Sequence, residues 1–238
     1  MKFTEIWVYL SATPLLGLTV TLVAYQLAFW IYTKLKLNPL ANPVAISVAL
    51  LVFLLWITNT PYATYFEGAQ FVHFLLGPAT VALAVPLYSN VQTLRKNLVP
   101  LAGALLAGSL VAALSAVGIG WLLGASRESL LSLAPKSVTT PIAMGIAEKL
   151  GGLPSLTAVL VVATGILGAV LARGTLNLLR IEDHAVRGFA VGVAAHGIGT
   201  ARAFQVSETM GAFAGLAMGL IGLLTAFLFP LRVKLWGG

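Results

Sequence analysis

The sequence predicts an all-α polytopic membrane protein. Of its 238 residues, 59% are hydrophobic and only 9% are charged, whereas soluble domains carry about a quarter charged residues. A membrane-spanning helix needs about 20 apolar residues, so after loops are subtracted the chain has room for about seven to eight membrane segments. Prolines and glycines interrupt several of the apolar stretches, which predicts broken or re-entrant helices and internal repeats.

The charge balance fits the same class. Lysine and arginine total 14 against 7 acidic residues, which gives a net charge of +7. These charges occur singly or in pairs, without a basic stripe that alternates with aromatic residues, so we expect cytoplasmic loops and no nucleic acid. Basic loops at 34–36, 95–96 and 173–187 are therefore assigned to the cytoplasmic side. Their order along the chain requires segment 127–150 to enter and leave the membrane by one side.

No pattern typical of catalysis or metal binding is present. The chain has no cysteine, and its three histidines are far apart and do not form an HExxH motif. Neither a nucleophile elbow nor a phosphate-binding loop occurs. We therefore expect no enzyme, no catalytic residue, no metal and no cofactor.

The first part of the chain, 1–68, is expected to form scaffold spans. Its two apolar stretches, 6–32 and 43–58, carry no charge and end in interfacial aromatic residues. They offer no polar group to a ligand. We therefore expect a surface that contacts another subunit, such as a second copy in a homodimer.

Residues 69–238 are expected to form a transport core built from repeats. Leu76–Val81 resembles Leu133–Val138, and a fainter third copy near 195–211 lacks the prolines. The repeats predict units near 71–123, 127–172 and 187–235, each a broken polar segment followed by a continuous helix. The expected breaks lie near 78, at 135–141 and at 196–202, and four residues mark the first two: Pro78, Thr80, Pro86 and Pro135. Broken segments at corresponding places in repeats are typical of transporter binding sites.

The segment APKSVTTP, which begins at Ala134, is the first candidate site. Two prolines six residues apart prevent a regular helix between them, and the second suits the first turn of a new helix. The N-terminus of that helix would present free N–H groups to an anion, and a lysine would add to its attraction. The alternative is a solvated loop with a surface lysine. The candidate binding residues here are Lys136, Ser137, Thr139, Thr140 and Pro141.

The segment GVAAHGIGTARAFQ, which begins at Gly192, is the second candidate site. On a regular helix, Gly188, Gly192, His196 and Thr200 would share one face. Arginine offers a fork that matches a carboxylate, and histidine changes its charge near neutral pH. The alternatives are a buried structural histidine and an interfacial arginine. The candidate binding residues are His196, Gly197, Gly199, Thr200 and Arg202, with His196 also a candidate proton carrier.

Glu148 and Glu208 form a third candidate, for ion coupling. Each precedes a long apolar helix at a corresponding place in two of the repeats. They could bind a proton or a cation. The alternative is a charge at a helix N-terminus that interacts with the helix dipole.

Three segments together resemble the LrgB family of bacterial membrane proteins, which includes CidB and YohK: FLLGPATVALAVPLY from Phe74, LAPKSVTTPIAMGIAEKLG from Leu133, and AHGIGTARAF from Ala195. The C-terminal half of the plastidial glycolate/glycerate translocator is similar. The resemblance implies residence in the bacterial inner membrane and a small LrgA-type membrane subunit as partner. It also implies two different functions, antiholin-like control of murein hydrolase export or transport of small carboxylates.

The residues favour transport over lysis control. A holin-like pore needs no broken polar segments that carry Lys136, His196 and Arg202, whereas a site for a small anion does. We therefore expect a secondary transporter of small monocarboxylates, coupled to protons or cations and elevator-like in its motion. An antiholin-like regulator of lysis is the alternative.

Overall fold

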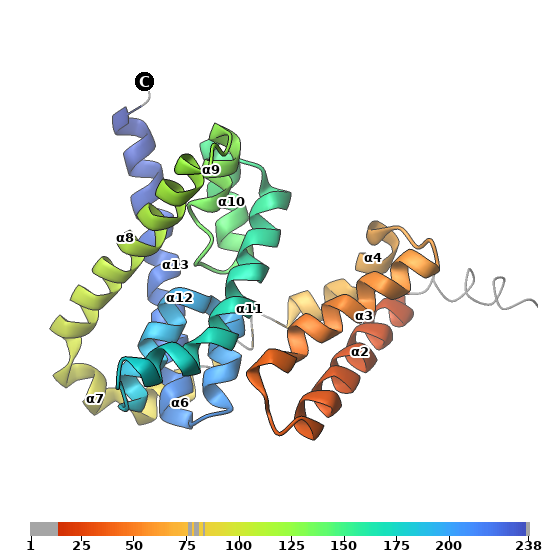
Figure 1. The fold of residues 1–238 in the computed structure, drawn as a ribbon, viewed down its shortest axis with the longest axis horizontal. Helices are drawn as coiled ribbons and strands as arrows, with labels where there is room; N and C mark the ends of the chain where they lie inside the picture. The colour runs from red at the N-terminus through yellow and green to blue at the C-terminus, as the bar shows by residue number, and fades with distance from the viewer. Residues whose placement is uncertain (1–13, 76–77, 79–80, 83, 237–238) are drawn as a thin grey trace, which may run out of the picture. The chain divides into compact units, whose positions relative to one another are not determined.

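A computed structural model describes residues 14–75, 78, 81–82 and 84–236, and all regular structure in these ranges is helical (Figure 1). The chain divides into two compact units, Met1–Ala82 and Leu83–Gly238. We call them unit 1 and unit 2 and describe each by itself. The functional division into scaffold and transport core stays a prediction.

In its described residues, unit 1 contains the helices α2, α3 and α4 and one short 3-10 turn. Helix α2 packs against both α3 and α4. A Cβ on Gly17 would lie 2.5 Å from the carbonyl oxygen of Tyr65, so only glycine allows this approach of α2 to α4. The Tyr65 hydroxyl also hydrogen-bonds Thr21 Oγ1 at 2.7 Å. The bounds are α2 Pro14–Lys34, η1 Pro39–Ala41, α3 Pro43–Ile57 and α4 Tyr62–Phe74.

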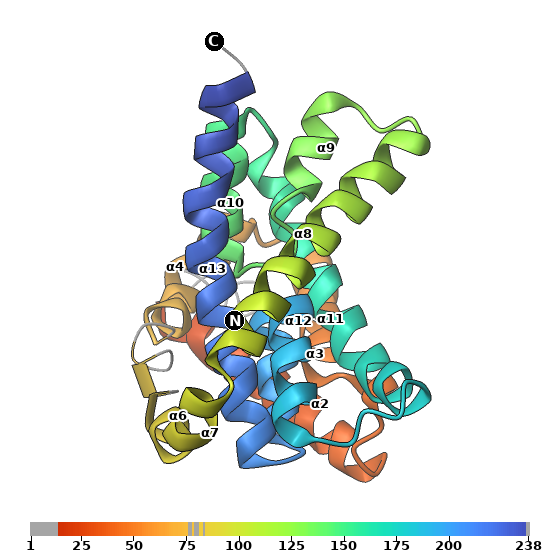
Figure 2. The same cartoon turned by 90° about the vertical axis from the view of Figure 1, so that its left-hand side faces the viewer.

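Unit 2 is built on three long helices, α8 (Leu98–Leu122), α11 (Pro154–Leu178) and α13 (Glu208–Trp236). Two short helices, α6 (Ala84–Ser89) and α7 (Val91–Lys96), precede them. Figure 2 shows α8 running up from the end where α7 lies, and α11 returning to that same end. The basic residues before α8 and at the end of α11 thus share one end of the unit, as the loop charges predict.

Among the described residues, four helices are long and apolar enough to cross a membrane: Leu15–Lys34, Leu98–Leu122, Pro154–Leu178 and Glu208–Ala226. Helix α3 is apolar but has only 15 residues. The finding supports a helical membrane protein. It does not confirm seven to eight membrane segments.

Residues 127–150 form a hairpin, which we call hairpin 1. Helix α9 (Arg127–Leu133) descends into unit 2, residues 134–139 are not helical, and α10 (Thr140–Leu150) returns (Figure 2). Ser132 ties the hairpin to the start of α11. Its hydroxyl accepts a hydrogen bond from Leu153 N–H at 2.7 Å, and its carbonyl accepts one from the Thr157 hydroxyl at 3.1 Å.

Residues 184–204, labelled α12 (His184–Phe204), form a second hairpin, hairpin 2. The backbone leaves the helix at Ala195 (φ −129°, ψ 15°) and His196 (φ 38°, ψ −135°). A Cβ on Gly199 would lie 2.8 Å from Val191 Cγ1, although these positions would be about 12 Å apart along a straight helix. The second half of α12 therefore folds back on the first.

The two hairpins enter unit 2 from opposite ends. Helix α11 connects them, and its 25 residues span about 37 Å, so the base of each hairpin lies at a different end. The tips approach each other, and we call residues 134–141 tip 1 and residues 195–197 tip 2. Val138 of tip 1 belongs to the same buried cluster as Val161 of α11 and Val193 of α12. Phe213 and Ile221 of α13 complete this core.

The expected first break lies mostly outside the described residues. Pro78 is described as helical, but Thr80 and its neighbours 76–77, 79 and 83 are not described. Pro86 lies in the first turn of α6, where proline is tolerated. A hairpin followed by a long helix occurs twice in unit 2, but the three internal repeats are not confirmed.

Candidate functional site

Tip 1 owes its shape to its two prolines. Pro135 is fully buried, and the chain stays non-helical until Pro141 enters the first turn of α10. The first hydrogen bond of α10 runs from Ala143 N–H to Thr139 O at 2.9 Å. The amides of Thr140 and Ile142 precede it, so they have no acceptor within the helix. The positive end of α10 therefore lies at the tip of the hairpin.

Lys136 supplies a positive charge to this tip. Its side chain is half-buried, and its ammonium group lies 3.4 Å from the hydroxyl of the buried Ser137. In the part of the chain that the structure describes, no carboxylate pairs with Lys136. Thr139 and Thr140 are half-buried beside it in sequence, and the Thr139 hydroxyl does not cap α10.

Tip 2 is held against α11 by His196. Its imidazole is 4% exposed, and Nε2 lies 2.8 Å from the carbonyl oxygen of Val161. A carbonyl can only accept, so Nε2 must carry the hydrogen and Nδ1 is the nitrogen that can take up another proton. The ring fits because α11 has glycine opposite it, since a Cβ on Gly165 would lie 2.6 Å from His196 Cε1.

The second half of α12 begins at Gly197 and runs away from the tip. The Thr200 hydroxyl donates to His196 O at 2.8 Å and lies 3.9 Å from Met218 Sδ. The amides of the first residues, Gly197 to Gly199, precede the first helical hydrogen bonds, so this half-helix also presents its positive end at the tip. A Cβ on Gly197 would meet only Met218 Sδ, at 3.8 Å.

The fold-back alters the helical face expected from sequence spacing. Gly188 and Gly192 lie against backbone carbonyls of α13, those of Met210 and Ala214, whereas His196 contacts α11. The four positions therefore do not share one face. The spacing argument assumed a straight helix, and the break at His196 turns the imidazole toward a different neighbour.

The tips bring together residues from both candidate segments. Lys136 of tip 1 lies close enough to His196 of tip 2 for their charges to interact. The Ser137 hydroxyl lies beside the Lys136 ammonium group, and Val138 packs in one cluster with Val161 and Val193. The lysine and the N-termini of the two half-helices therefore lie in the same part of unit 2.

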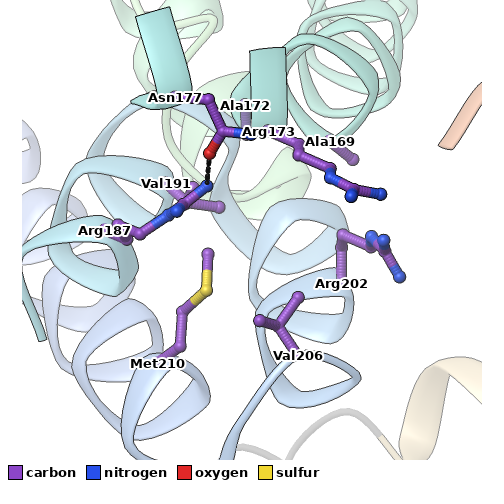
Figure 3. Close-up of a pocket in the computed structure, with 9 residues that line it drawn as sticks. All are labelled: Ala169, Ala172, Arg173, Asn177, Arg187, Val191, Arg202, Val206 and Met210. Atoms are coloured by element: carbon purple, nitrogen blue, oxygen red, sulfur yellow. Dashed lines mark hydrogen bonds between the residues drawn. The ribbon is translucent and has the colours of Figure 1, made fainter. Parts of the chain in front are cut away.

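Arg202 lies elsewhere. It is near the far end of the second half of α12, where its guanidinium donates to Gln205 Oε1 at 3.1 Å. Figure 3 shows it in a pocket with Arg173 and Arg187. The charge pattern predicts a cytoplasmic loop for those two arginines and gives no sign of the pocket, because only the fold-back of α12 brings positions 187 and 202 to one pocket.

Glu148 and Glu208 are exposed and lie away from the tips. Glu148 is in the last turn of α10, and Glu208 is the first residue of α13. Hairpin 1 and hairpin 2 have their bases at opposite ends, so these two carboxylates belong to different ends of unit 2. No group of three or more His, Asp or Glu side chains gathers as a metal site within the described residues.

Comparison with known proteins identifies relatives over nearly the whole chain. A model of the LrgB-like family matches residues 21–235. The uncharacterised proteins YxaC and YwbG of Bacillus subtilis are 36% and 35% identical over 216 residues, which is 91% of this chain and 94% and 96% of theirs. Antiholin-like protein LrgB of Bacillus cereus is 28% identical over 227 residues, 95% of this chain and 99% of that protein. No solved structure matches the chain.

Proposed function

This chain belongs to the LrgB family, and on that premise we propose that it is a secondary transporter of small monocarboxylates in the bacterial inner membrane. The substrate would bind between the tips of hairpins 1 and 2. The class includes anions such as glycolate, glycerate, pyruvate and lactate.

One observation carries the proposal. Lys136 is half-buried without a carboxylate partner among the described residues, and it lies where two half-helices point their N-termini. A charge removed from water without a partner loses several kcal/mol of hydration. An anionic ligand would supply the missing charge, and the free amides of both half-helices would hydrogen-bond its oxygens.

The charge at the tips favours a monoanion. One lysine and the partial charges of two helix ends can neutralise one carboxylate, and the hydroxyls of Thr139 and Thr140 can donate to a hydroxyl or keto oxygen beside it. A dicarboxylate would leave one charge unpaired inside unit 2. The site therefore suits a short carboxylate with one polar substituent.

His196 supports coupling to protons. With Nε2 donating to Val161 O, protonation at Nδ1 would add a second positive charge beside Lys136. That charge would favour anion binding, so proton and substrate would bind together and leave together. The first half of α12 also ends at this tip, and its terminal carbonyls offer a second way to bind a cation.

A second candidate function rests on the relatives. The Bacillus cereus protein is named antiholin-like, and this name supports a regulator of murein hydrolase export and lysis more directly than it supports transport. In that function the chain would act through contacts with a holin-type or LrgA-type membrane protein. The apolar, largely exposed helices of unit 1 are the surface we propose for such a subunit or for a second copy.

The first experiment separates the two functions. Vesicles that contain the purified protein should accumulate labelled glycolate or pyruvate, faster with an inward proton gradient, and protein-free vesicles should not. Succinate should compete poorly because of its second charge. No uptake of any monocarboxylate, together with altered lysis when the protein is expressed beside an LrgA-type partner, would reject transport and favour the antiholin-like function.

A second experiment tests assembly. Crosslinks between unit 1 helices of neighbouring copies should form and leave uptake intact if unit 1 is a fixed scaffold and unit 2 moves in an elevator-like manner. Crosslinks that abolish uptake would contradict the fixed scaffold.

A further inference from the structure

One face of helix α2 carries a polar side chain in the middle of an apolar span. We propose that this face is a contact between two copies of the chain, and that the Gln26 amides of the two copies hydrogen-bond each other across it. This contact lies within the surface proposed above for unit 1, and it is independent of what unit 2 binds.

Helix α2 packs one face against the rest of unit 1 and leaves the other exposed. Ala24, Ala28 and Tyr32 are buried, and they lie on the side where Gly17 approaches Tyr65 of α4. The opposite side is exposed along the whole described helix. We call its residues the seam of α2: Leu15, Thr19, Leu22, Gln26, Trp30 and Thr33.

The seam has the spacing of a coiled-coil contact. Its successive members are three or four positions apart, which is the pattern that lets two helices pack side by side along their length. A polar residue at one position of such a contact fixes the register and the number of helices, because its partner has to lie opposite. Gln26 is the one amide in the seam.

Gln26 lies too deep in the span for its amide to reach either membrane surface. The apolar span Leu15–Lys34 ends eight residues after Gln26, which is about 12 Å along the helix. Helical side chains are tilted toward the N-terminus of their helix, so that of Gln26 points away from this nearer end. Trp30 and Lys34, whose ammonium group lies 5.7 Å from the centre of the Trp30 ring, mark that end as the interface.

The Gln26 amide makes no hydrogen bond to the described residues of its own chain. In contrast, the amide of Gln70 in α4 donates to Glu67 O at 2.7 Å, and the Ser109 hydroxyl of α8 donates to Leu106 O at 3.0 Å. An amide without a partner in hydrocarbon is costly, and lipid tails offer none. Polar side chains of membrane helices instead hydrogen-bond across helix contacts, so we expect a neighbouring protein to supply the partner.

A second copy of the chain matches this amide by symmetry. Two copies inserted with the same topology have parallel α2 helices and place Gln26 at the same depth, so the two amides meet at the two-fold axis. An amide can both donate and accept, and each amide can therefore bond the other. An LrgA-type subunit would instead need a polar side chain at the same depth.

Dimerisation in lipid vesicles tests the role of the amide, by single-molecule photobleaching over a range of protein-to-lipid ratios. The wild-type protein should dimerise, and Gln26→Leu should raise the dissociation constant at least about fivefold, the effect of one or two hydrogen bonds between membrane helices. Leucine suits a lipid-exposed position, so this variant should fold. Gln26→Asn keeps an amide and should lose less. Leu27→Ala, exposed but outside the seam, should stay within about twofold of wild type.

Crosslinking tests the face itself, because the chain has no cysteine and single cysteines can be introduced. Under mild oxidation in vesicles, Leu22→Cys and Trp30→Cys, one turn to either side of Gln26, should form disulfide-linked dimers. Val52→Cys, exposed on α3, should form them far more slowly. The proposal is rejected if the wild-type protein is monomeric at every ratio, if Gln26→Leu dimerises like wild type, or if Val52→Cys crosslinks as readily as Leu22→Cys. None of these measurements depends on uptake, so they stand apart from the test of transport.

Discussion

The tips of hairpins 1 and 2 lie in the same part of unit 2, but the helix is broken by different means in each of them. Tip 1 is broken by two prolines six positions apart, and each proline removes a backbone donor. Tip 2 contains no proline, and its break lies at His196, whose φ of 38° is disfavoured for any residue with a Cβ. Tip 1 is thus non-helical by composition, whereas tip 2 is held open by its contacts with α11 at Val161 and Gly165.

The two tips also differ in the ionisable group that each carries. Tip 1 carries the primary amine of a lysine, and tip 2 carries an imidazole, the side chain whose charge ordinarily changes near neutral pH. A carrier that couples an anion to a proton needs both kinds of group near one another. The predictions below test this division between the tips, from the largest expected effect to the smallest.

Removing the charge of tip 1 should have the largest effect. Lys136→Gln should reduce monocarboxylate uptake by about 100-fold or more, because a buried charge that loses its partner costs about 3–5 kcal/mol. The matched control is Lys149→Gln, an exposed lysine at the other end of α10, which should keep nearly wild-type uptake. Equal losses in both variants would show that tip 1 does not bind the substrate.

The second largest effect is expected when the space between tip 2 and α11 is filled. Gly165→Ala places a Cβ 2.6 Å from the His196 ring, and such overpacking costs about 1–3 kcal/mol. We expect a lower thermal unfolding midpoint and impaired uptake. Gly174→Ala on the same helix meets no atom within 4 Å and should be neutral or stabilising. A Gly165→Ala variant as stable as Gly174→Ala would contradict the contact between His196 and α11.

The backbone of tip 2 predicts that glycine is more stabilising than alanine at position 196, which is the reverse of their order in a regular helix. His196→Gly should be more stable than His196→Ala by about 1–2 kcal/mol, because only glycine adopts a positive φ without strain. At Ala194, in the helical first half, glycine should instead cost about 0.5–1 kcal/mol. Denaturant unfolding in detergent measures both pairs. If alanine is the more stable residue at 196, the break is absent in solution.

The smallest expected effect is at a hydroxyl of tip 1. Thr140→Val removes one donor at nearly constant volume and should raise the KM for uptake about 2–10-fold, the range for one hydrogen bond between neutral groups. Thr175→Val, an exposed threonine near the end of α11, is the control. An unchanged KM in Thr140→Val would remove this hydroxyl from the site.

Tip 1 is easier to predict from the sequence than tip 2, for a physical reason. Proline restricts the backbone wherever it stands, so Pro135 and Pro141 marked a break without knowledge of the fold. The break at His196 depends on Val161 and Gly165, which are 35 and 31 positions earlier, and the sequence suggested only the neighbouring glycines. The family resemblance is confirmed, whereas the roles of the site residues stay predictions.

The number of membrane crossings and the arginine pocket cannot be predicted from the sequence, for the same reason. Counting apolar residues treats each stretch as a full crossing, but α9, α10 and the two halves of α12 are too short to cross singly. Arg187 and Arg202 would be about 22 Å apart on a straight helix, so no spacing rule joins them. Long-range packing decides both features.

The bonds of Ser132 have a mechanical consequence. They fasten hairpin 1 to the start of α11, whereas Gly188 and Gly192 seat hairpin 2 directly on the backbone of α13. Hairpin 1 is therefore fastened at its base to α11, whereas hairpin 2 is seated on α13 and meets α11 at its tip, where His196 bonds Val161. Sliding α11 past α13 by a few ångströms would strain that bond, so the position of tip 2 is mechanically linked to the relative movement of the two helices.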